Sequence, residues 1–366
     1  MIETKYIQPY IGEPDKNRIL SAFKREPVDR VPNFENLIED KHVEKILGKY
    51  AGNTLAIGGD PAKGAGSESG RPMYPDDYID LCNIIGQDAM RFEAGFWTPF
   101  KKEDENGKMV QVADRSVKNR RDFDSLILDS ENQIKKSVGY VLEYKKSVKK
   151  RKTKIAVGCV FGCLLETLYD SLVGMNDFMM MVYEDRELVE HMLEISTIHF
   201  SNLCEAVVEA GVDFVWIADD VAFKTGLFIP PKLFKEIWTK RMARIMTPAL
   251  SRDIPVIFHS DGRIDDIVED MIDIGISCLN PMDPYATDYR EYKKRYGNRL
   301  CLSGNMDIEL LAKGTPEDIE KDIKEHMEVL KPGYGYIATC SHSLVNYIPY
   351  NNVIAYFNSI HKFGKY

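Results

Sequence analysis

The sequence predicts an α/β protein built as a single (β/α)8 TIM barrel. Short apolar runs alternate with polar segments of helical periodicity, and this alternation indicates a parallel sheet covered by helices. Eight such runs occur in 366 residues, which fits a closed barrel better than an open sheet. A doubly wound sheet, the runner-up, would carry a glycine-rich phosphate loop after its first strand, and this chain has none there. We therefore expect one domain over residues 1–366, with residues 1–30 as a helical N-terminal extension.

The eight expected strands are short apolar or β-rich runs. In chain order they span residues 31–36, 89–95, 154–162, 213–220, 255–262, 277–283, 300–307 and 335–343. The clearest helices between them cover residues 187–211, 265–276 and 316–331, where apolar residues recur with a period near 3.6. Residues 52–76 hold six glycines and three prolines and fit neither pattern. We interpret this stretch either as a surface loop or as a lid over the barrel mouth.

Composition limits the class of protein. A net charge of -9 argues against nucleic-acid binding, and no apolar run approaches the roughly 20 residues that span a bilayer. The N-terminus lacks an apolar signal segment and the seven cysteines are odd in number, so we expect a cytoplasmic protein with reduced thiols. The basic run 145–154 is interpreted as the solvated end of a helix or as a docking surface for an acidic partner.

Polar residues follow most of the expected strands, at the edge where barrel enzymes place their active sites. These residues are Glu35, Glu93, Asp219, Asp220, His259, Asp261, Asn280, Asn305, Cys340 and His342. Four aromatic residues near strand ends are expected either to line a binding site or to belong to the core. They are Phe96, Trp97, Phe100 and Phe223.

The spacing of two pairs suggests a metal site. His259 and Asp261 are two apart on one expected strand, so their side chains point the same way, and Cys340 and His342 repeat this spacing. Imidazole, carboxylate and thiolate groups are zinc ligands, and three of them leave a position open for catalysis. Two alternatives remain: His259 and Asp261 could form an acid–base pair without metal, and Asp219–Asp220 could cap a helix.

Several motifs in this order resemble the uroporphyrinogen decarboxylase superfamily, and within it the corrinoid-dependent methyltransferases. The matching segments are residues 17–33 (with Asp-Arg-Val-Pro), 217–237, 259–283, 300–307 and 340–353. The decarboxylases carry an arginine-rich segment that binds substrate carboxylates, but the residues after Pro32 here read NFENLIEDK. This departure favours the methyltransferase branch, which binds zinc through a His-x-Cys and a later Cys. His259 matches the first ligand, Asp261 replaces the second, and Cys340 or His342 stands near the third.

The resemblance implies a methyltransferase that passes a methyl group from a small donor to the cobalt of a corrinoid protein. The oxygen- and nitrogen-rich ligand set favours a methoxylated aromatic donor, with zinc or an acid activating the leaving oxygen. Uroporphyrinogen decarboxylation and a non-catalytic corrinoid- or tetrapyrrole-binding barrel are the alternatives, and homo-oligomerisation is left open.

Roles are expected as follows. His259, His342 and Asp219 are catalytic; Glu35, Glu93, Phe96, Trp97, Asp220, Asn280 and Asn305 bind substrate; His259, Asp261, Cys340 and His342 bind zinc.

Overall fold

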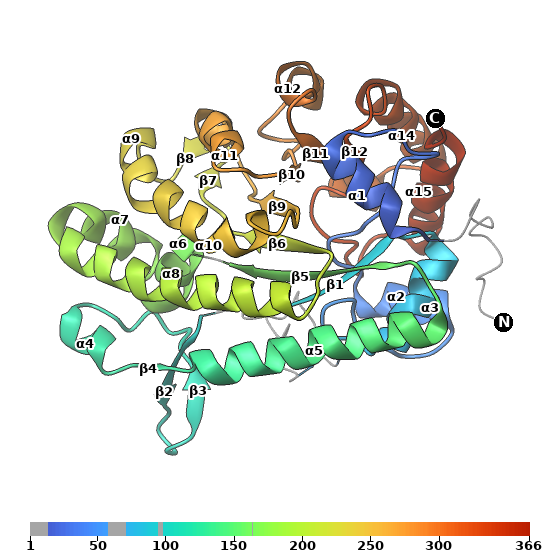
Figure 1. The fold of residues 1–366 in the computed structure, drawn as a ribbon. Coiled ribbons are helices and arrows are strands. Elements are labelled where there is room, and N and C mark those ends of the chain that lie inside the picture. Colours follow the sequence, from blue (N-terminus) through green and yellow to red (C-terminus); the bar gives the residue numbers. More distant parts are fainter. Residues whose placement is uncertain (1–13, 58–70, 94–97, 163) are drawn as a thin grey trace. The chain divides into compact units, whose positions relative to one another are not determined.

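The computed structural model describes residues 14–57, 71–93, 98–162 and 164–366 of an α/β fold (Figure 1). The chain forms two compact units. Unit 1 comprises Met1–Glu93, Leu142–Gly158 and Ser277–Tyr366, and unit 2 comprises Ala94–Val141 and Cys159–Ile276. Each unit combines parallel strands with helices.

Seven of the eight expected strands are present in the main sheet, where they follow one another in chain order. Unit 1 contains β1 (Ala89–Glu93), β10 (Cys278–Asn280), β11 (Cys301–Ser303) and β12 (Tyr336–Ile337), and the last three pair in parallel. Unit 2 contains β6 (Phe214–Ala218) parallel to β9 (Val256–His259). Strand β5 (Ala156–Gly162) begins in unit 1 and ends in unit 2.

The closed eight-stranded barrel is not confirmed, because the first expected strand forms only isolated bridges. Asn33 bridges in parallel to Gln87, just before β1, and to Ala338, just after β12. The Phe34 N–H donates to the Ala338 carbonyl (3.1 Å), and the Ala338 N–H donates to the Pro32 carbonyl (2.9 Å). Pro32 has no N–H to extend this ladder, so residues 31–36 stay irregular at the position of a strand.

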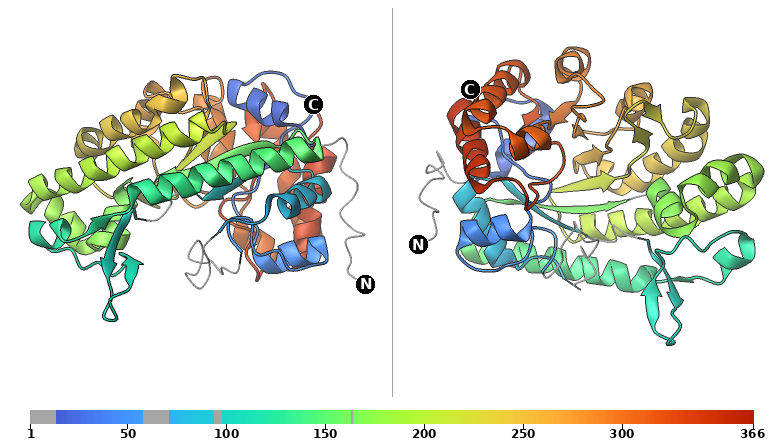
Figure 2. Two further views of the ribbon diagram at one scale, coloured as in Figure 1. Left: turned by 60° about the horizontal axis from the view of Figure 1, so that its bottom comes forward. Right: turned by 180° about the vertical axis from the view of Figure 1, so that it is seen from behind.

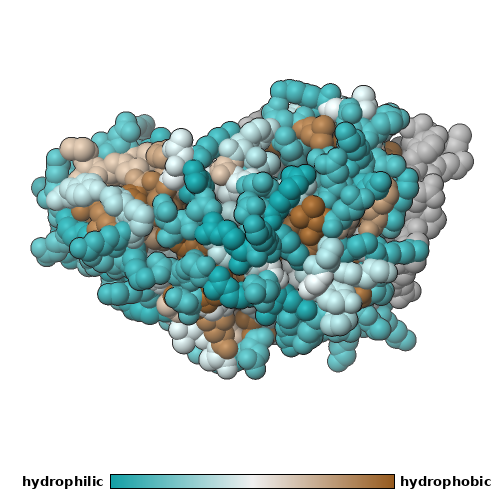
Figure 3. All heavy atoms as spheres, turned by 90° about the horizontal axis from the view of Figure 1, so that it is seen from above, coloured by the Kyte–Doolittle hydropathy of each residue, from teal (hydrophilic) through white to brown (hydrophobic). Residues whose placement is uncertain are grey.

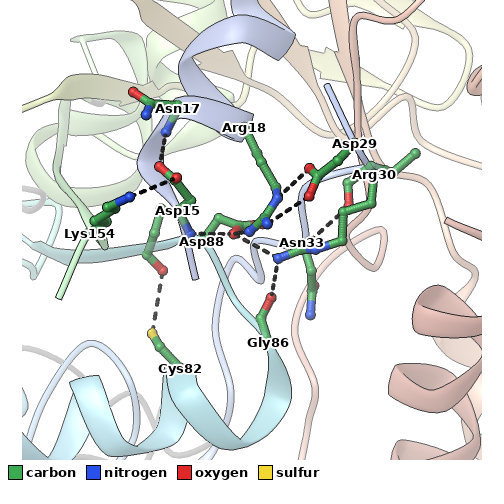
Figure 4. Close-up of polar contacts among 12 residues, drawn as sticks. Asp15, Asn17, Arg18, Asp29, Arg30, Asn33, Cys82, Gly86, Asp88 and Lys154 are labelled. Carbon is green, nitrogen blue, oxygen red and sulfur yellow. Dashed lines mark hydrogen bonds and ion pairs between the residues drawn. The ribbon is translucent and has the colours of Figure 1, made fainter. Parts of the chain in front are cut away.

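A buried ion-pair network fixes the start of β1 (Figure 4). The Asp88 carboxylate accepts from the Arg30 guanidinium (2.8 Å), from Arg18 (3.0 Å) and from the Asp15 N–H (2.9 Å). Arg18 also pairs with Asp29 at 2.6 Å. Asp29 and Arg30 of the Asp-Arg-Val-Pro motif are therefore ion-pair partners that anchor the chain just before residues 31–36.

Among the helices of unit 1, α14 lies within the expected range 316–331. The helices of this unit are α1 (Lys16–Lys24), α2 (Asp40–Leu47), α3 (Pro75–Ile85), α12 (Tyr289–Tyr296), α13 (Ile308–Lys313), α14 (Pro316–Leu330) and α15 (Tyr350–Phe363). A capping box between Thr315 and Asp318 begins α14, and its buried apolar residues pack against α15, which lies beside it in Figures 1 and 2. Within residues 1–30, α1 covers Lys16–Lys24, and residues 1–13 lie outside the described residues. The N-terminal extension as such stays a prediction.

The helices of unit 2 surround β5, β6 and β9. They are α4 (Arg120–Asp124), α6 (Leu164–Glu166), a π-helix (Thr167–Leu172), α7 (Met175–Glu184), α8 (Arg186–Glu209), α9 (Pro231–Phe234), a second π-helix (Lys235–Thr239), α10 (Lys240–Leu250), a 3₁₀ turn (Asp265–Ile267) and α11 (Val268–Asp273). Helices α8 and α10 pack side by side (Figures 1 and 2). Every residue of β5 and β6 is buried, so these strands form the centre of the core. Helix α5 (Ser130–Arg151) begins in unit 2 and ends in unit 1.

Two small antiparallel sheets in unit 2 were not predicted from the sequence. Strands β2 (Phe100–Glu103), β3 (Met109–Gln111) and β4 (Ile127–Leu128) form one, with β2 in the middle. Strands β7 (Ala222–Phe223) and β8 (Gly226–Leu227) form a hairpin immediately after β6. The second of these sheets adjoins the candidate site.

On the face drawn in Figure 3, hydrophilic residues cover most of the surface and hydrophobic residues form separate patches. No helix in the described ranges combines the length and apolar character needed to cross a membrane. The basic run 145–154 ends α5, and several of its cations pair with acids. Arg151 contacts Asp80 at 2.5 Å, and Lys154 lies 3.8 Å from Asp15. Of the expected loop 52–76, residues 58–70 lie outside the described residues, and α3 begins at Pro75.

Candidate functional site

The site in unit 2 is built where two neighbouring parallel strands end. Ala218, the last residue of β6, pairs with His259, the last residue of β9. One further hydrogen bond, from the Asp219 N–H to the His259 carbonyl (3.0 Å), holds the two chains together beyond the sheet. Asp220 and Asp261 follow at this carboxyl edge, as expected for a site at strand ends.

Asp220, His259 and Asp261 form a compact group of metal-binding type. Within the described residues this is the single group of three or more His, Cys, Asp or Glu side chains whose ligand atoms all lie within 4.8 Å of one another. His259 Nε2 lies 3.9 Å from Asp261 Oδ1, and their side chains are 11% and 36% exposed. The Asp261 N–H donates to Asp220 Oδ1 (2.8 Å) and orients that carboxylate. One nitrogen and two oxygen atoms of potential ligands therefore lie close together, and the Asp261 side chain is the one most exposed to solvent in the pair with His259.

Asp219 has a different environment from its neighbour. Its carboxylate is fully buried and accepts hydrogen bonds from the Leu165 and Glu166 N–H groups (2.9–3.1 Å) and from Trp238 Nε1 (2.6 Å). It therefore caps the helical turn that follows β5. Burial raises the pKa of Asp219 to about 7, against the opposing effect of these donors. The structure thus gives Asp219 a capping and positioning environment, and its expected catalytic role stays a prediction.

The loop 259–263 is tied to the β7–β8 hairpin (Figure 1). The Val221 N–H donates to Ser260 Oγ (3.1 Å), and the Arg263 N–H donates to the Phe223 carbonyl (2.8 Å). Gly262 lies between these contacts with φ +84°, and a Cβ atom there would lie 2.4 Å from the Ala222 carbonyl oxygen. Glycine is required at this position for both reasons. The hairpin and the metal-binding group consequently hold each other in place.

Glu35 and Cys340, two of the expected site residues, meet in the interior of unit 1. Tyr356 Oη donates to Glu35 Oε1 (2.5 Å), while the Cys340 N–H (3.2 Å) and Thr339 Oγ1 (3.3 Å) donate to Oε2. Burial raises the pKa of the Glu35 carboxyl, and burial together with Glu35 raises the pKa of the Cys340 thiol well above its usual range.

The two expected amide residues of unit 1 are also engaged with protein groups. Asn280 Nδ2 donates to Ser303 Oγ (3.1 Å). Asn305 Nδ2 donates to the Met282 carbonyl (2.7 Å), and its oxygen accepts from His326 Nε2 (2.9 Å). Both amides are buried, so each fixes a strand-end turn.

The remaining expected site residues that the structure describes belong to unit 1. His342 is exposed in unit 1, and Glu93 is the last residue of β1. Phe96 and Trp97 lie outside the described residues. The predicted ligands His259 and Asp261 are therefore brought together, whereas Cys340 and His342 belong to unit 1.

A comparison with protein families matches residues 103–363 to the uroporphyrinogen decarboxylase (URO-D) model. The chain belongs to the URO-D family. Among curated relatives of this URO-D protein, the methylcobamide:CoM methyltransferase MtaA of Methanosarcina barkeri is 30% identical over 174 residues, which cover 46% of this chain and 50% of MtaA. The match thus spans about half the length of that relative. The uroporphyrinogen decarboxylase of Hydrogenovibrio crunogenus is 23% identical over 352 residues, 91% of this chain and 93% of the relative.

A solved structure supports the fold of the URO-D protein over nearly its whole length. The methyltransferase from Methanosarcina mazei aligns with a TM-score of 0.69 and 20% identity, covering 96% of this chain and 99% of that one. At this identity the similarity shows a shared fold. The family resemblance expected from the sequence motifs is therefore confirmed.

Sequence reasoning assigned Asp220 to substrate binding and did not place it among the metal ligands. The signal was present, because side chains alternate in direction along an extended chain and only one of Asp219 and Asp220 can point inward. The partners of Asp219 were missed. These partners are the N–H groups of residues 165–166 and the indole of Trp238. They are distant from Asp219 along the chain, so no local sequence pattern predicts them.

Proposed function

We propose that this URO-D family member is a methyltransferase that moves a methyl group from a methoxylated aromatic donor to the cobalt of a corrinoid protein. The observation that carries the proposal is the Asp220–His259–Asp261 group at the carboxyl ends of β6 and β9. The chain is also similar in sequence to one protein named as a methyltransferase, and similar in fold to another. The group and these two similarities support the proposal.

The three side chains fit a zinc ion as resident metal. Their ligand atoms lie within 4.8 Å of one another, and three protein ligands leave the fourth tetrahedral position open. Compared with a thiolate set, a nitrogen and two oxygens leave zinc a harder Lewis acid, suited to an oxygen leaving group. Bound zinc would polarise the ether oxygen. In this proposal Asp220 is the third ligand in place of Cys340 or His342, because its carboxylate lies in the same group as His259 and Asp261.

In the proposed reaction the reduced cobalt of the partner's corrinoid attacks the methyl carbon in line. A carbon–cobalt bond forms, the carbon–oxygen bond breaks, and its electron pair stays on the oxygen, which takes a proton to give a phenol. The Asp261 N–H keeps Asp220 oriented, and Asp219 holds the helical turn behind it. We propose that solvent, which reaches the partly exposed Asp261, supplies the proton. The expected catalytic role of His342, which is exposed in unit 1, stays a prediction.

The test combines metal analysis with a donor screen. Tag-free protein should contain about one zinc per chain, and His259→Ala and Asp220→Ala should each lower that content. With a reacting donor, His259→Ala should cost roughly a hundredfold in rate, because a Lewis acid supplies several kcal/mol. The matched control is His191→Ala, a partly exposed histidine of α8 outside the site. Full activity in a metal-free preparation would contradict the zinc role.

A second candidate is uroporphyrinogen decarboxylation. It is favoured by the alignment with the Hydrogenovibrio crunogenus enzyme over 91% of this chain. Incubation with uroporphyrinogen and chromatography for coproporphyrinogen tests it directly. Product formation by the wild type would replace the methyltransferase proposal, and its absence together with donor demethylation would support it.

A further inference from the structure

We propose that Phe223 binds the aromatic ring of the donor by stacking and thereby sets the preference for aromatic over aliphatic methyl ethers. This inference rests on the proposed function and names the residue that would recognise its substrate. It follows from the hairpin contacts, from a series of tilted and edge-to-face ring contacts and from the exposure of Phe223.

The hairpin places Phe223 beside the metal-binding group. Asp220 lies two residues before the start of β7, and Phe223 is the last residue of that strand. The carbonyl of Phe223 accepts from the Arg263 N–H, two residues beyond the ligand Asp261. Gly262 approaches this hairpin more closely than any side chain would allow. The backbone of Phe223 is therefore fixed relative to loop 259–263.

A run of aromatic rings leads from the core of unit 2 to Phe223. Phe178 is fully buried, and its ring centroid lies 6.3 Å from that of Tyr169. Tyr169 packs edge-on against Phe228 at 5.3 Å, and Phe228 lies 4.5 Å from Phe223. Tyr169 Oη also donates to the Asp220 carbonyl (2.7 Å), so the run is attached to the ligand-bearing segment itself.

Phe223 is the open end of this run. It is 50% exposed, whereas Tyr169 is 8% exposed and Phe178 is fully buried. A flat aromatic ring placed against Phe223 would continue the same series of tilted and edge-to-face contacts that the inner rings already make. An aliphatic group of equal size would gain burial but not these ring contacts. The observations therefore favour an aromatic donor.

Binding of two matched ethers tests this inference without any methyl transfer. The zinc-loaded full chain is titrated by ligand-observed NMR with anisole and with methoxycyclohexane, which has the same ether group on a saturated ring. We expect the wild type to bind anisole about twofold to tenfold more tightly, the range expected for one aromatic pair. Phe223→Leu should lose this preference and Phe223→Trp should keep it. Thermal unfolding of both variants checks that they fold.

The control is Tyr183→Leu, which removes a 67% exposed ring from α7 and should leave both affinities unchanged. The inference is wrong if Phe223→Leu binds anisole as the wild type does, or if the wild type prefers neither ether. Methyl transfer from a methoxylated aromatic donor in that case would leave the proposed function standing. A Phe223-dependent preference for anisole without any transfer would support the ring-binding role and count against the reaction.

Discussion

The adjacent acids Asp219 and Asp220 have different tasks because they face different surroundings. The Asp219 carboxylate is buried and accepts hydrogen bonds from residues 165, 166 and 238. The Asp220 carboxylate accepts one N–H and lies close to the side chains of His259 and Asp261. Alternation along the extended chain separates the two side chains. One acid supports the local structure, and the other is available to a ligand.

Replacing Asp219 should unfold the protein more readily. Asp219→Ala leaves the Leu165, Glu166 and Trp238 donors buried without an acceptor, so we expect a loss of about 3 kcal/mol or more in unfolding free energy. Asp185→Ala is the matched control, because this N-cap of α8 accepts a single N–H and should cost only about 1 kcal/mol. Urea denaturation measures both. Equal losses would mean that Asp219 is no more than an ordinary cap.

At this scale the sequence predicted that His259 and Asp261 lie together, but it did not predict the partners of the buried site residues. The pairing of His259 with Asp261 followed from their spacing. The contact of Cys340 with Glu35 did not, because it joins residues 305 positions apart. Spacing along one strand is a local property, whereas burial of a thiol against a carboxyl depends on the packed interior.

Among the elements, the β7–β8 hairpin depends on one glycine. Gly262 has positive φ, and a Cβ there would meet the carbonyl oxygens of Ala222 and Phe223 at 2.4 and 2.8 Å. The hairpin can approach loop 259–263 because that Cβ is absent. This contact is the structural link between the metal-binding group and the aromatic run.

Gly262→Ala should therefore destabilise the protein and disturb the site together. We expect a loss of roughly 2 kcal/mol or more, with a lower zinc content. Gly107→Ala provides the comparison, since Gly107 also has positive φ (+72°) but meets nothing within 4 Å. It should cost about 1 kcal/mol and leave zinc unchanged. Thermal unfolding and metal analysis measure both effects. If the two variants behave identically, the close contact between Gly262 and the hairpin does not stabilise the site.

Element prediction succeeded where the pattern was periodic. Seven apolar runs became strands, and α14 lies within the expected range 316–331. Residues 31–36 failed to form a strand because Pro32 interrupts the ladder. The β2–β3–β4 sheet was missed because its strands are short and mostly exposed. Their sequences therefore lack the apolar pattern by which a buried strand is predicted.

For the whole molecule, two buried histidines predict how stability depends on pH. Burial lowers the pKa of His199 in unit 2 and of His361 in unit 1 to about 4. The ordinary value for an unfolded chain is near 6.5, so between these values the unfolded state binds more protons than the folded state. Their contribution to stability is complete above pH 6.5 and is lost as the pH falls toward 4.

We expect each histidine to account for a loss on the order of 2 kcal/mol in unfolding free energy between pH 7 and pH 4.5. The double variant His199→Gln, His361→Gln should show a flatter dependence over this window. His191→Gln, at a partly exposed histidine, serves as control and should follow the wild type. Urea titrations at several pH values provide the measurement, and parallel curves for the wild type and the double variant would refute the assignment.

The α/β class was predictable because it rests on alternation along the entire chain and tolerates errors in single elements. Closure of the sheet into a barrel was not predictable from the sequence. It depends on whether one short segment around Asn33 makes a full strand or isolated bridges. The difference lies in a few hydrogen bonds.

The position of Phe223 on a short hairpin also bears on how donor range could evolve. Strands β7 and β8 have two residues each, and the two residues joining them, Lys224 and Thr225, are exposed. Exposed loop tips accept insertions and substitutions at small cost to folding. Natural selection or an engineer could therefore exchange this short segment to change substrate preference while Asp220, His259 and Asp261 stay as they are.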